Sequence, residues 1–157
     1  RDGAVAGGGS LRIADGVAQL AGAATAPAHR RRGVQTALLS AHLADALLGA
    51  AGLGDLGRLF PADARTPRGI ASADLLAEVV ARLANGGARP ASVDVTIVAA
   101  RPRLGPRLET IRLRLAELLD LDAGAVNVKA STGNLSGVEG AGRAISARAV
   151  ATIEPAR

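Results

Sequence analysis

The sequence predicts one mixed α/β (α+β) domain in which helices cover one face of a mixed sheet. Its 157 residues suit a single domain with its own core, so we expect one domain over residues 1–157. Hydrophobic residues make up 48% of the chain, which favours a folded over a disordered protein. Segments with helical periodicity occur between segments that alternate like strands, and this order is typical of a layered fold.

The first half of the chain is expected to form a hairpin and then a helix. Residues 10–25 alternate apolar positions on either side of Asp15 and Gly16, a dipeptide typical of a tight turn. The periodicity of residues 34–50 predicts a helix, and the glycines that follow should end it. Residues 55–71 should be irregular, because prolines interrupt them.

The second half should supply two more helices and the other strands. One helix is expected to start after Ser72 as its N-cap, and another should open at Pro106. Apolar residues alternate with polar ones over residues 93–97, which predicts a strand. Strand-like patterns also predict a short strand over residues 126–128 and a last strand over residues 143–153.

The net charge of +5 comes almost entirely from arginine, since Lys129 is the only lysine. Such a charge suits nucleic acid, a membrane surface or a phosphorylated ligand. Phe60 is the only aromatic residue, and single-stranded nucleic acid usually needs aromatic stacking platforms. We therefore expect no nucleic-acid partner. A small phosphorylated ligand and a merely Ala/Arg-rich composition both remain open.

Cysteine is absent, which excludes disulfides and thiolate metal sites. The start of the chain does not look like a signal peptide, and no apolar run approaches membrane-spanning length. The expectation from these features is a cytoplasmic protein with no membrane partner.

Four segments appear in the order and near the spacing of one known family. They are DALLGAAGLGDLGRLFP (45–61), VDVTIVAARPRLGPRL (93–108), VNVKAST (126–132) and GVEGAGRAIS (137–146). Over about residues 43–155 the chain resembles 2-C-methyl-D-erythritol 2,4-cyclodiphosphate synthase. The resemblance implies a homotrimer with active sites between subunits. It also implies a phosphorus–oxygen lyase of isoprene biosynthesis, in the methylerythritol phosphate pathway.

The reaction implied by the resemblance is an internal phosphate transfer. In 4-diphosphocytidyl-2-C-methyl-D-erythritol 2-phosphate, the 2-phosphate attacks the nearer phosphorus of the diphosphate, the ring closes and CMP leaves. The protein supplies no covalent nucleophile in such a step. Positioning and neutralisation of phosphate charge carry the catalysis.

The resemblance also implies the residues of the site. Thr132 matches a threonine near the diphosphate and is the expected catalytic residue. Residues 55–57 match a contact to the methylerythritol phosphate part, and residues 99–104 match the loop that holds cytosine. The family's arginine of the last loop falls on Ala141, so Arg143 is expected to serve the phosphates instead. The expected substrate-binding residues are Asp55, Leu56, Gly57, Phe60, Pro61, Asp63, Ala99, Ala100, Arg101, Pro102, Arg103, Leu104, Ser131, Gly133, Asn134, Val138 and Arg143.

A divalent metal (zinc, magnesium or manganese) is the cofactor that the resemblance implies, and its usual ligands are missing. The family has Asp-x-His near its N-terminus and a histidine four residues before Asp45, where this chain has Ala41. His42 is the candidate metal ligand that remains. It lies one residue after the position of the family's histidine, and a shift of one residue along a helix rotates the side chain by about 100°. A helix-surface hydrogen bond with Asp45 is the alternative role. Since a catalytic zinc normally takes three protein ligands, we expect weak or absent turnover.

Residues 1–42 form an atypical N-terminal segment with a different resemblance. Residues 16–39 are similar to the acetyl-CoA-binding segment of GNAT acetyltransferases, with successive backbone N–H groups at residues 33–36 and arginines at residues 30–32. Such a segment can cradle a pyrophosphate. Two alternatives to the synthase therefore remain, a non-catalytic nucleotide-binding or structural trimer and an acetyl-CoA binder.

Overall fold

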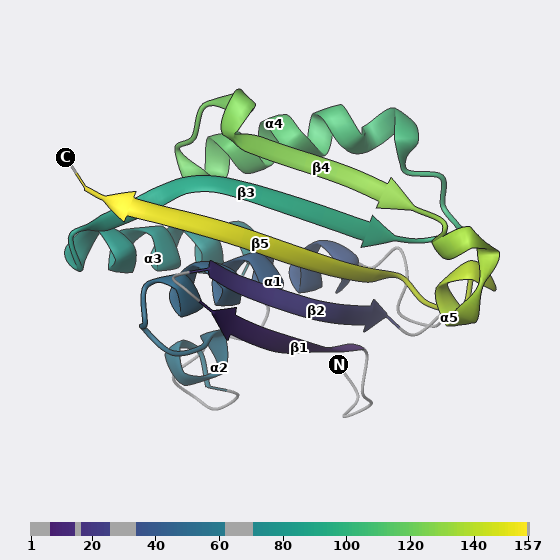
Figure 1. Ribbon diagram of the computed structural model, residues 1–157, viewed down its shortest axis with the longest axis horizontal. Helices are drawn as coiled ribbons and strands as arrows, with labels where there is room; N and C mark the ends of the chain where they lie inside the picture. Colours follow the sequence, from purple (N-terminus) through teal and green to yellow (C-terminus); the bar gives the residue numbers. More distant parts are fainter. Residues whose placement is uncertain (1–6, 15–16, 26–33, 62–70, 157) are drawn as a thin grey trace.

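A computed structural model describes residues 7–14, 17–25, 34–61 and 71–156, with side chains described from Ser40 onward within these ranges. Its centre is a five-stranded sheet in the order β1-β2-β5-β3-β4 (Figure 1). Strands β3 and β4 run parallel, whereas the other neighbouring pairs run antiparallel. The predicted mixed sheet is therefore confirmed. Its strands are β1 (Gly7–Ala14), β2 (Val17–Thr25), β3 (Ala88–Val98), β4 (Val126–Ser131) and β5 (Ser146–Pro155).

The predicted hairpin is present, because β1 and β2 pair antiparallel on either side of Asp15 and Gly16, which lie outside the described residues. The strand expected over residues 93–97 is longer, since its pairing with β5 extends back to Ala88. The last strand begins at Ser146 rather than at Arg143, because residues 143–145 still belong to the preceding loop.

Three helices lie on one face of the sheet, as predicted (Figure 1). They are α1 (Val34–Ala50), α3 (Ser72–Asn85) and α4 (Leu108–Leu119). Helix α1 contacts β2 and β5, and α3 packs against it. The end of α1 is a Schellman motif: Leu53 N–H donates to Leu48 C=O at 2.9 Å and Gly52 N–H to Gly49 C=O at 3.1 Å. Gly52 has a φ of 68°, a conformation that glycine adopts without steric cost.

Three local expectations were wrong. Ser72 is the first helical residue of α3 rather than its N-cap, and Ala71 precedes it without a side-chain cap. Pro106 lies in a 3₁₀ turn, η2 (Gly105–Arg107), so α4 starts two residues later than Pro106 suggested. The segment expected to be irregular contains a one-turn helix, α2 (Leu56–Leu59), because Asp55 caps its N-terminus.

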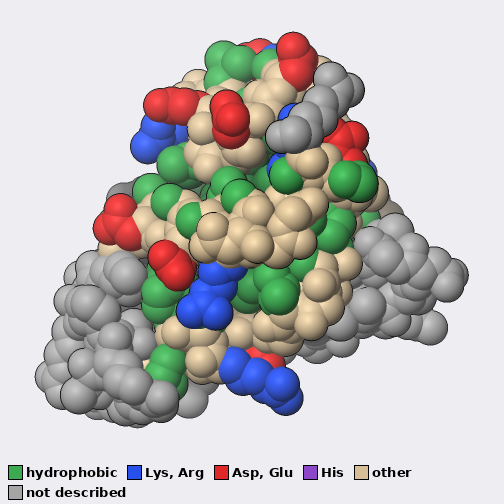
Figure 2. Space-filling view, turned by 90° about the vertical axis from the view of Figure 1, so that its left-hand side faces the viewer, with side chains coloured by type: hydrophobic (Ala, Val, Ile, Leu, Met, Phe, Trp, Pro, Cys, Tyr) green, Lys and Arg blue, Asp and Glu red, His purple; other side chains and the backbone are tan. Residues whose placement is uncertain are grey.

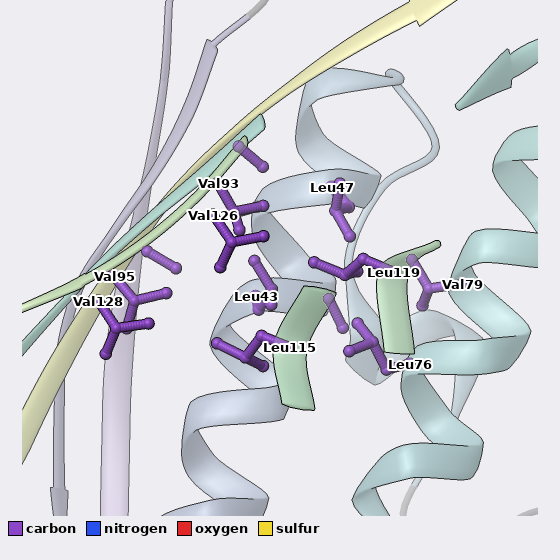
Figure 3. Packing of buried hydrophobic residues seen from close by; sticks show 14 of the residues in the cluster. Leu43, Leu47, Leu76, Val79, Val93, Val95, Leu115, Leu119, Val126 and Val128 are labelled. Atoms are coloured by element: carbon purple, nitrogen blue, oxygen red, sulfur yellow. The ribbon is translucent and has the colours of Figure 1, made fainter. Parts of the chain in front are cut away.

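The core lies between the sheet and the helices (Figure 3). Val93, Val95 and Val126 project from β3 and β4 toward leucines of α1, α3 and α4. Burial of each such side chain contributes about 1.5–3 kcal/mol. The largest fully buried side chains are Leu43, Leu47, Leu48, Leu76, Leu83, Leu119, Val79 and Val95.

The opposite face of the sheet carries polar contacts between neighbouring strands. Asp94 on β3 pairs with Lys129 on β4 and accepts a hydrogen bond of 2.8 Å from Asn127. Ser92 and Thr152 share a hydrogen bond of 2.7 Å across β3 and β5. No helix within the described ranges is both long and apolar enough to cross a bilayer.

Candidate functional site

Two loops meet at the edge of the sheet where β3 and β4 end. Because these strands run parallel with Val98 opposite Ser131, the segments that follow them leave from the same edge. We call residues 99–104 and 132–143 the edge loops. They hold most of the residues expected to bind substrate, and the carboxyl edge of parallel strands is a common place for ligands.

Backbone hydrogen bonds join the edge loops to each other. Ala99 N–H donates to Ser131 C=O at 2.8 Å, and Ala100 N–H donates to Glu139 C=O at 3.3 Å. Gly133 N–H donates to Ser131 Oγ at 3.0 Å, which turns the chain directly after β4. The predicted cytosine loop and the predicted phosphate loop are thereby in direct contact.

The second edge loop folds tightly on itself through η4 (Gly133–Leu135) and α5 (Gly137–Gly140). A Cβ atom on Gly140 would lie 2.1 Å from the carbonyl carbon of Leu135, so only glycine fits there. Asn134 and Leu135 have φ angles of 55° and 59°. Left-handed backbone at non-glycine residues costs about 1–3 kcal/mol each and gathers at functional sites.

The edge loops expose positive charge. The side chains of Arg101, Arg103 and Arg143 are exposed, and none forms an ion pair with another described residue. Thr132, the expected catalytic residue, is exposed in the same loops, directly after the end of β4. Guanidinium groups bind phosphate oxygens in charge-assisted hydrogen bonds. These loops can therefore take a phosphorylated ligand.

A second group of expected site residues surrounds α2. Asp55 Oδ1 accepts the backbone N–H of Arg58 at 2.9 Å, and Asp55 Oδ2 lies 3.2 Å from Arg58 Nε. Gly57 follows in the first turn and is exposed, while Phe60 and Pro61 are half-buried where α2 ends. Asp63 lies outside the described residues.

The sequence interpretation considered Asp45 only as a partner of His42 and did not expect it in this group. Asp45 Oδ1 accepts the backbone N–H of Leu56 at 2.6 Å and so connects α1 to α2. Burial raises the pKa of the Asp45 carboxyl above its usual range, and the Leu56 N–H opposes this rise. A signal was present, since Asp45 is the one acid within the apolar run of residues 43–48.

The residues around His42 do not fit the implied metal. His42 is only 5% exposed and lies on the buried side of α1, whereas Ala41 and Asp45 share the half-exposed side. Across the described ranges, no group of three or more His, Cys, Asp or Glu side chains could hold an ion.

Helix α2 lies below and left of the centre in Figure 1, well away from the edge loops around α5 at the right. A cavity of about 410 Å³ also lies away from the edge loops, lined by Val80, Ala84, Arg89, Pro90, Leu119, Asp120 and Ala156. Figure 2 shows the end of the molecule that faces away from the edge loops, with acidic side chains gathered on its upper part and hydrophobic side chains exposed below. The cavity of about 410 Å³ is lined by none of the expected site residues.

The fold and the edge loops define an α/β protein with a candidate site for a phosphorylated ligand at the edge of its sheet. A family model described as the YgbB family matches residues 36–154. The chain belongs to the YgbB family. The match does not include residues 1–35, and the comparisons do not support the expected GNAT-like segment over residues 16–39.

Relatives and solved structures agree with this assignment. The chain is 48% identical over 120 residues to 2-C-methyl-D-erythritol 2,4-cyclodiphosphate synthase of Chromobacterium violaceum, covering 76% of this chain and 75% of that protein. It is 49% identical over 111 residues to the bifunctional enzyme IspD/IspF of an Anaeromyxobacter species, covering 71% of this chain and 29% of that enzyme. Among structures, the IspF–CDP complex of Plasmodium falciparum has a TM-score of 0.66 at 25% identity, over 76% of this chain and 72% of that one.

Proposed function

We propose that the chain binds 4-diphosphocytidyl-2-C-methyl-D-erythritol 2-phosphate between the subunits of a homotrimer and converts it slowly to the cyclic diphosphate and CMP. The observation that carries the proposal is the pair of edge loops, with exposed arginines and joined backbones, in a member of the YgbB family. We expect the cytidine end of the substrate to lie on these loops, and the similar IspF of Plasmodium falciparum forms a complex with CDP.

The separation of the two groups of site residues supports an assembly. Strand β3 alone is 11 residues long, which at about 3.3 Å per residue places its two ends roughly 35 Å apart. The edge loops follow one end of this strand, and α2 lies toward the other end of the molecule (Figure 1). This separation supports a site in which the two groups come from different subunits.

The chemistry expected at the edge loops is neutralisation of phosphate charge. Arg101, Arg103 and Arg143 would bind diphosphate oxygens, and the Thr132 hydroxyl would donate to a phosphate oxygen as CMP leaves. The described residues include no group that could hold a metal ion, so we expect this neutralisation to be weaker than in a site that carries a metal. Slow turnover is the consequence that we expect.

Turnover is tested by following CMP release and the cyclic product with ³¹P NMR. We expect slow conversion that Thr132→Val lowers at least about tenfold, because one hydrogen bond to the developing charge is lost. Thr110→Val, on an exposed turn of α4, is the matched control and should not change the rate. A complete lack of conversion would favour the alternative, a non-catalytic nucleotide-binding or structural trimer.

The assembly and the metal are tested separately. Light scattering of the purified protein should give three chain masses, and a single chain mass would overturn the site between subunits. Metal analysis after purification should find far less than one zinc per chain. A stoichiometric, tightly held zinc would contradict the metal account.

The acetyl-CoA interpretation stays a prediction, since residues 26–33 lie outside the described residues. A ligand that binds only the folded chain raises its melting temperature. Stabilisation by coenzyme A and not by CMP would favour this interpretation over the synthase.

A further inference from the structure

Asp45 makes a contact for which the family resemblance assigns no role. It lies on the half-exposed side of α1, and its Oδ1 accepts the N–H of Leu56 at 2.6 Å, 11 residues further along the chain. The distance is that of a well-formed hydrogen bond, and leaving a backbone N–H without an acceptor is costly. This bond therefore fixes the start of α2 against the longest helix of the described chain.

Helix α2 depends on such support. It has four residues, far fewer than an isolated helix needs for stability. The first N–H groups of any helix lack partners within the helix. Here two carboxylates supply them, since Asp45 accepts from Leu56 and Asp55 accepts from Arg58.

We propose that Asp45 is a positioning residue, which holds residues 55–57 in the conformation that contacts the methylerythritol phosphate part of the substrate. The inference rests on the proposed function. It assigns Asp45 no contact with substrate and no role in proton transfer. Loss of the Asp45 carboxylate should therefore weaken binding of the methylerythritol end of the substrate. Binding of the cytidine end, on the distant edge loops, should not change.

The role requires a hydrogen-bond acceptor and not a charge. Asp45→Asn keeps an oxygen in place of Oδ1, whereas Asp45→Ala removes it. If Asp45 contributed only to general stability, the effects of the two substitutions on substrate binding would depend only on side-chain size and packing. Rescue by asparagine therefore separates positioning of residues 55–57 from a general structural role.

The first test compares two ligands by calorimetry, the intact substrate and CMP. Asp45→Ala should bind the substrate about tenfold more weakly and bind CMP as the wild type does. Asp45→Asn should bind both within about twofold of the wild type. Asp74→Ala, which removes an exposed acid from the first turn of α3, is the matched control and should change neither affinity. Equal binding of the substrate by wild type and Asp45→Ala would overturn the inference.

The second test needs no ligand. Hydrogen exchange of the Leu56 amide, followed by NMR, should be slow in the wild type and in Asp45→Asn and at least about tenfold faster in Asp45→Ala. Unchanged protection in Asp45→Ala would overturn the anchoring. If the wild type binds neither compound, the proposed function and the ligand part of this inference both fail, and the exchange rates decide the anchoring part alone.

Discussion

Ala99 donates its backbone N–H to the carbonyl oxygen of Ser131 at 2.8 Å, one residue beyond the point where β3 and β4 stop pairing. This bond continues the ladder into the edge loops and holds the predicted cytosine loop beside Thr132. The geometry of the site therefore depends on backbone contacts as much as on side chains.

Gly140→Ala should disrupt the second edge loop. The new Cβ would lie 2.1 Å from Leu135, and relieving such an overlap costs about 1–3 kcal/mol. We expect a lower urea midpoint and loss of CMP binding. Gly105→Ala is the matched control, because no atom lies within 4 Å of its new Cβ. Normal CMP binding by Gly140→Ala would show that this loop is not part of the site.

Arg143→Gln should weaken CDP binding about tenfold, because it removes a charge-assisted hydrogen bond to a phosphate. The loss should shrink as salt is raised, since salt screens an exposed charge. Arg114→Gln on α4 removes another exposed arginine, one that pairs with Glu117, and should leave CDP affinity unchanged. Equal losses in the two variants would mean that net charge alone attracts the nucleotide.

Asp45→Asn should be more stable than the wild type at neutral pH. Burial raises the pKa of Asp45, with Asp55 adding to the rise, while Leu56 N–H and His42 oppose it. An acid with a raised pKa in the folded state costs stability as pH rises through that pKa. Urea midpoints should therefore differ at pH 7 and converge near pH 3, below the ordinary pKa of about 3.9. A stability difference that does not change with pH would contradict this account.

Lys129→Gln should lower stability at neutral pH only. The hydrogen bond from Lys129, with help from Asn127, holds the pKa of Asp94 below its usual range. Such a pair stabilises the fold above the unfolded pKa, and its contribution is lost as pH falls through the folded pKa. Both side chains are about half exposed, so we expect about 0.2–1 kcal/mol. A loss of the same size at pH 2 would contradict an electrostatic origin.

The sequence predicted most of the fold, because its helices and strands carry regular apolar patterns. The bounds of the helix over residues 34–50 were confirmed, since glycines follow it closely. Ser72 was wrongly taken as an N-cap, because serine is common both at that position and in the first turn.

The candidate site was predictable only through the family resemblance. Periodicity does not reveal which loops meet, and the contact between Ala99 and Ser131 follows from parallel pairing of strands 33 residues apart in register. The Asp45–Leu56 bond was missed for the same reason. This contact depends on the path that the chain takes after α1. The sequence around Asp45 shows only an acid within an apolar run and does not indicate that path.

Calorimetric titration of the wild-type chain with CMP in the presence of EDTA tests the central claim most directly. We expect about one CMP bound per chain, with the same affinity whether or not metal is present. Absence of binding, or binding that appears only after zinc is added, would contradict a nucleotide site built from the edge loops alone.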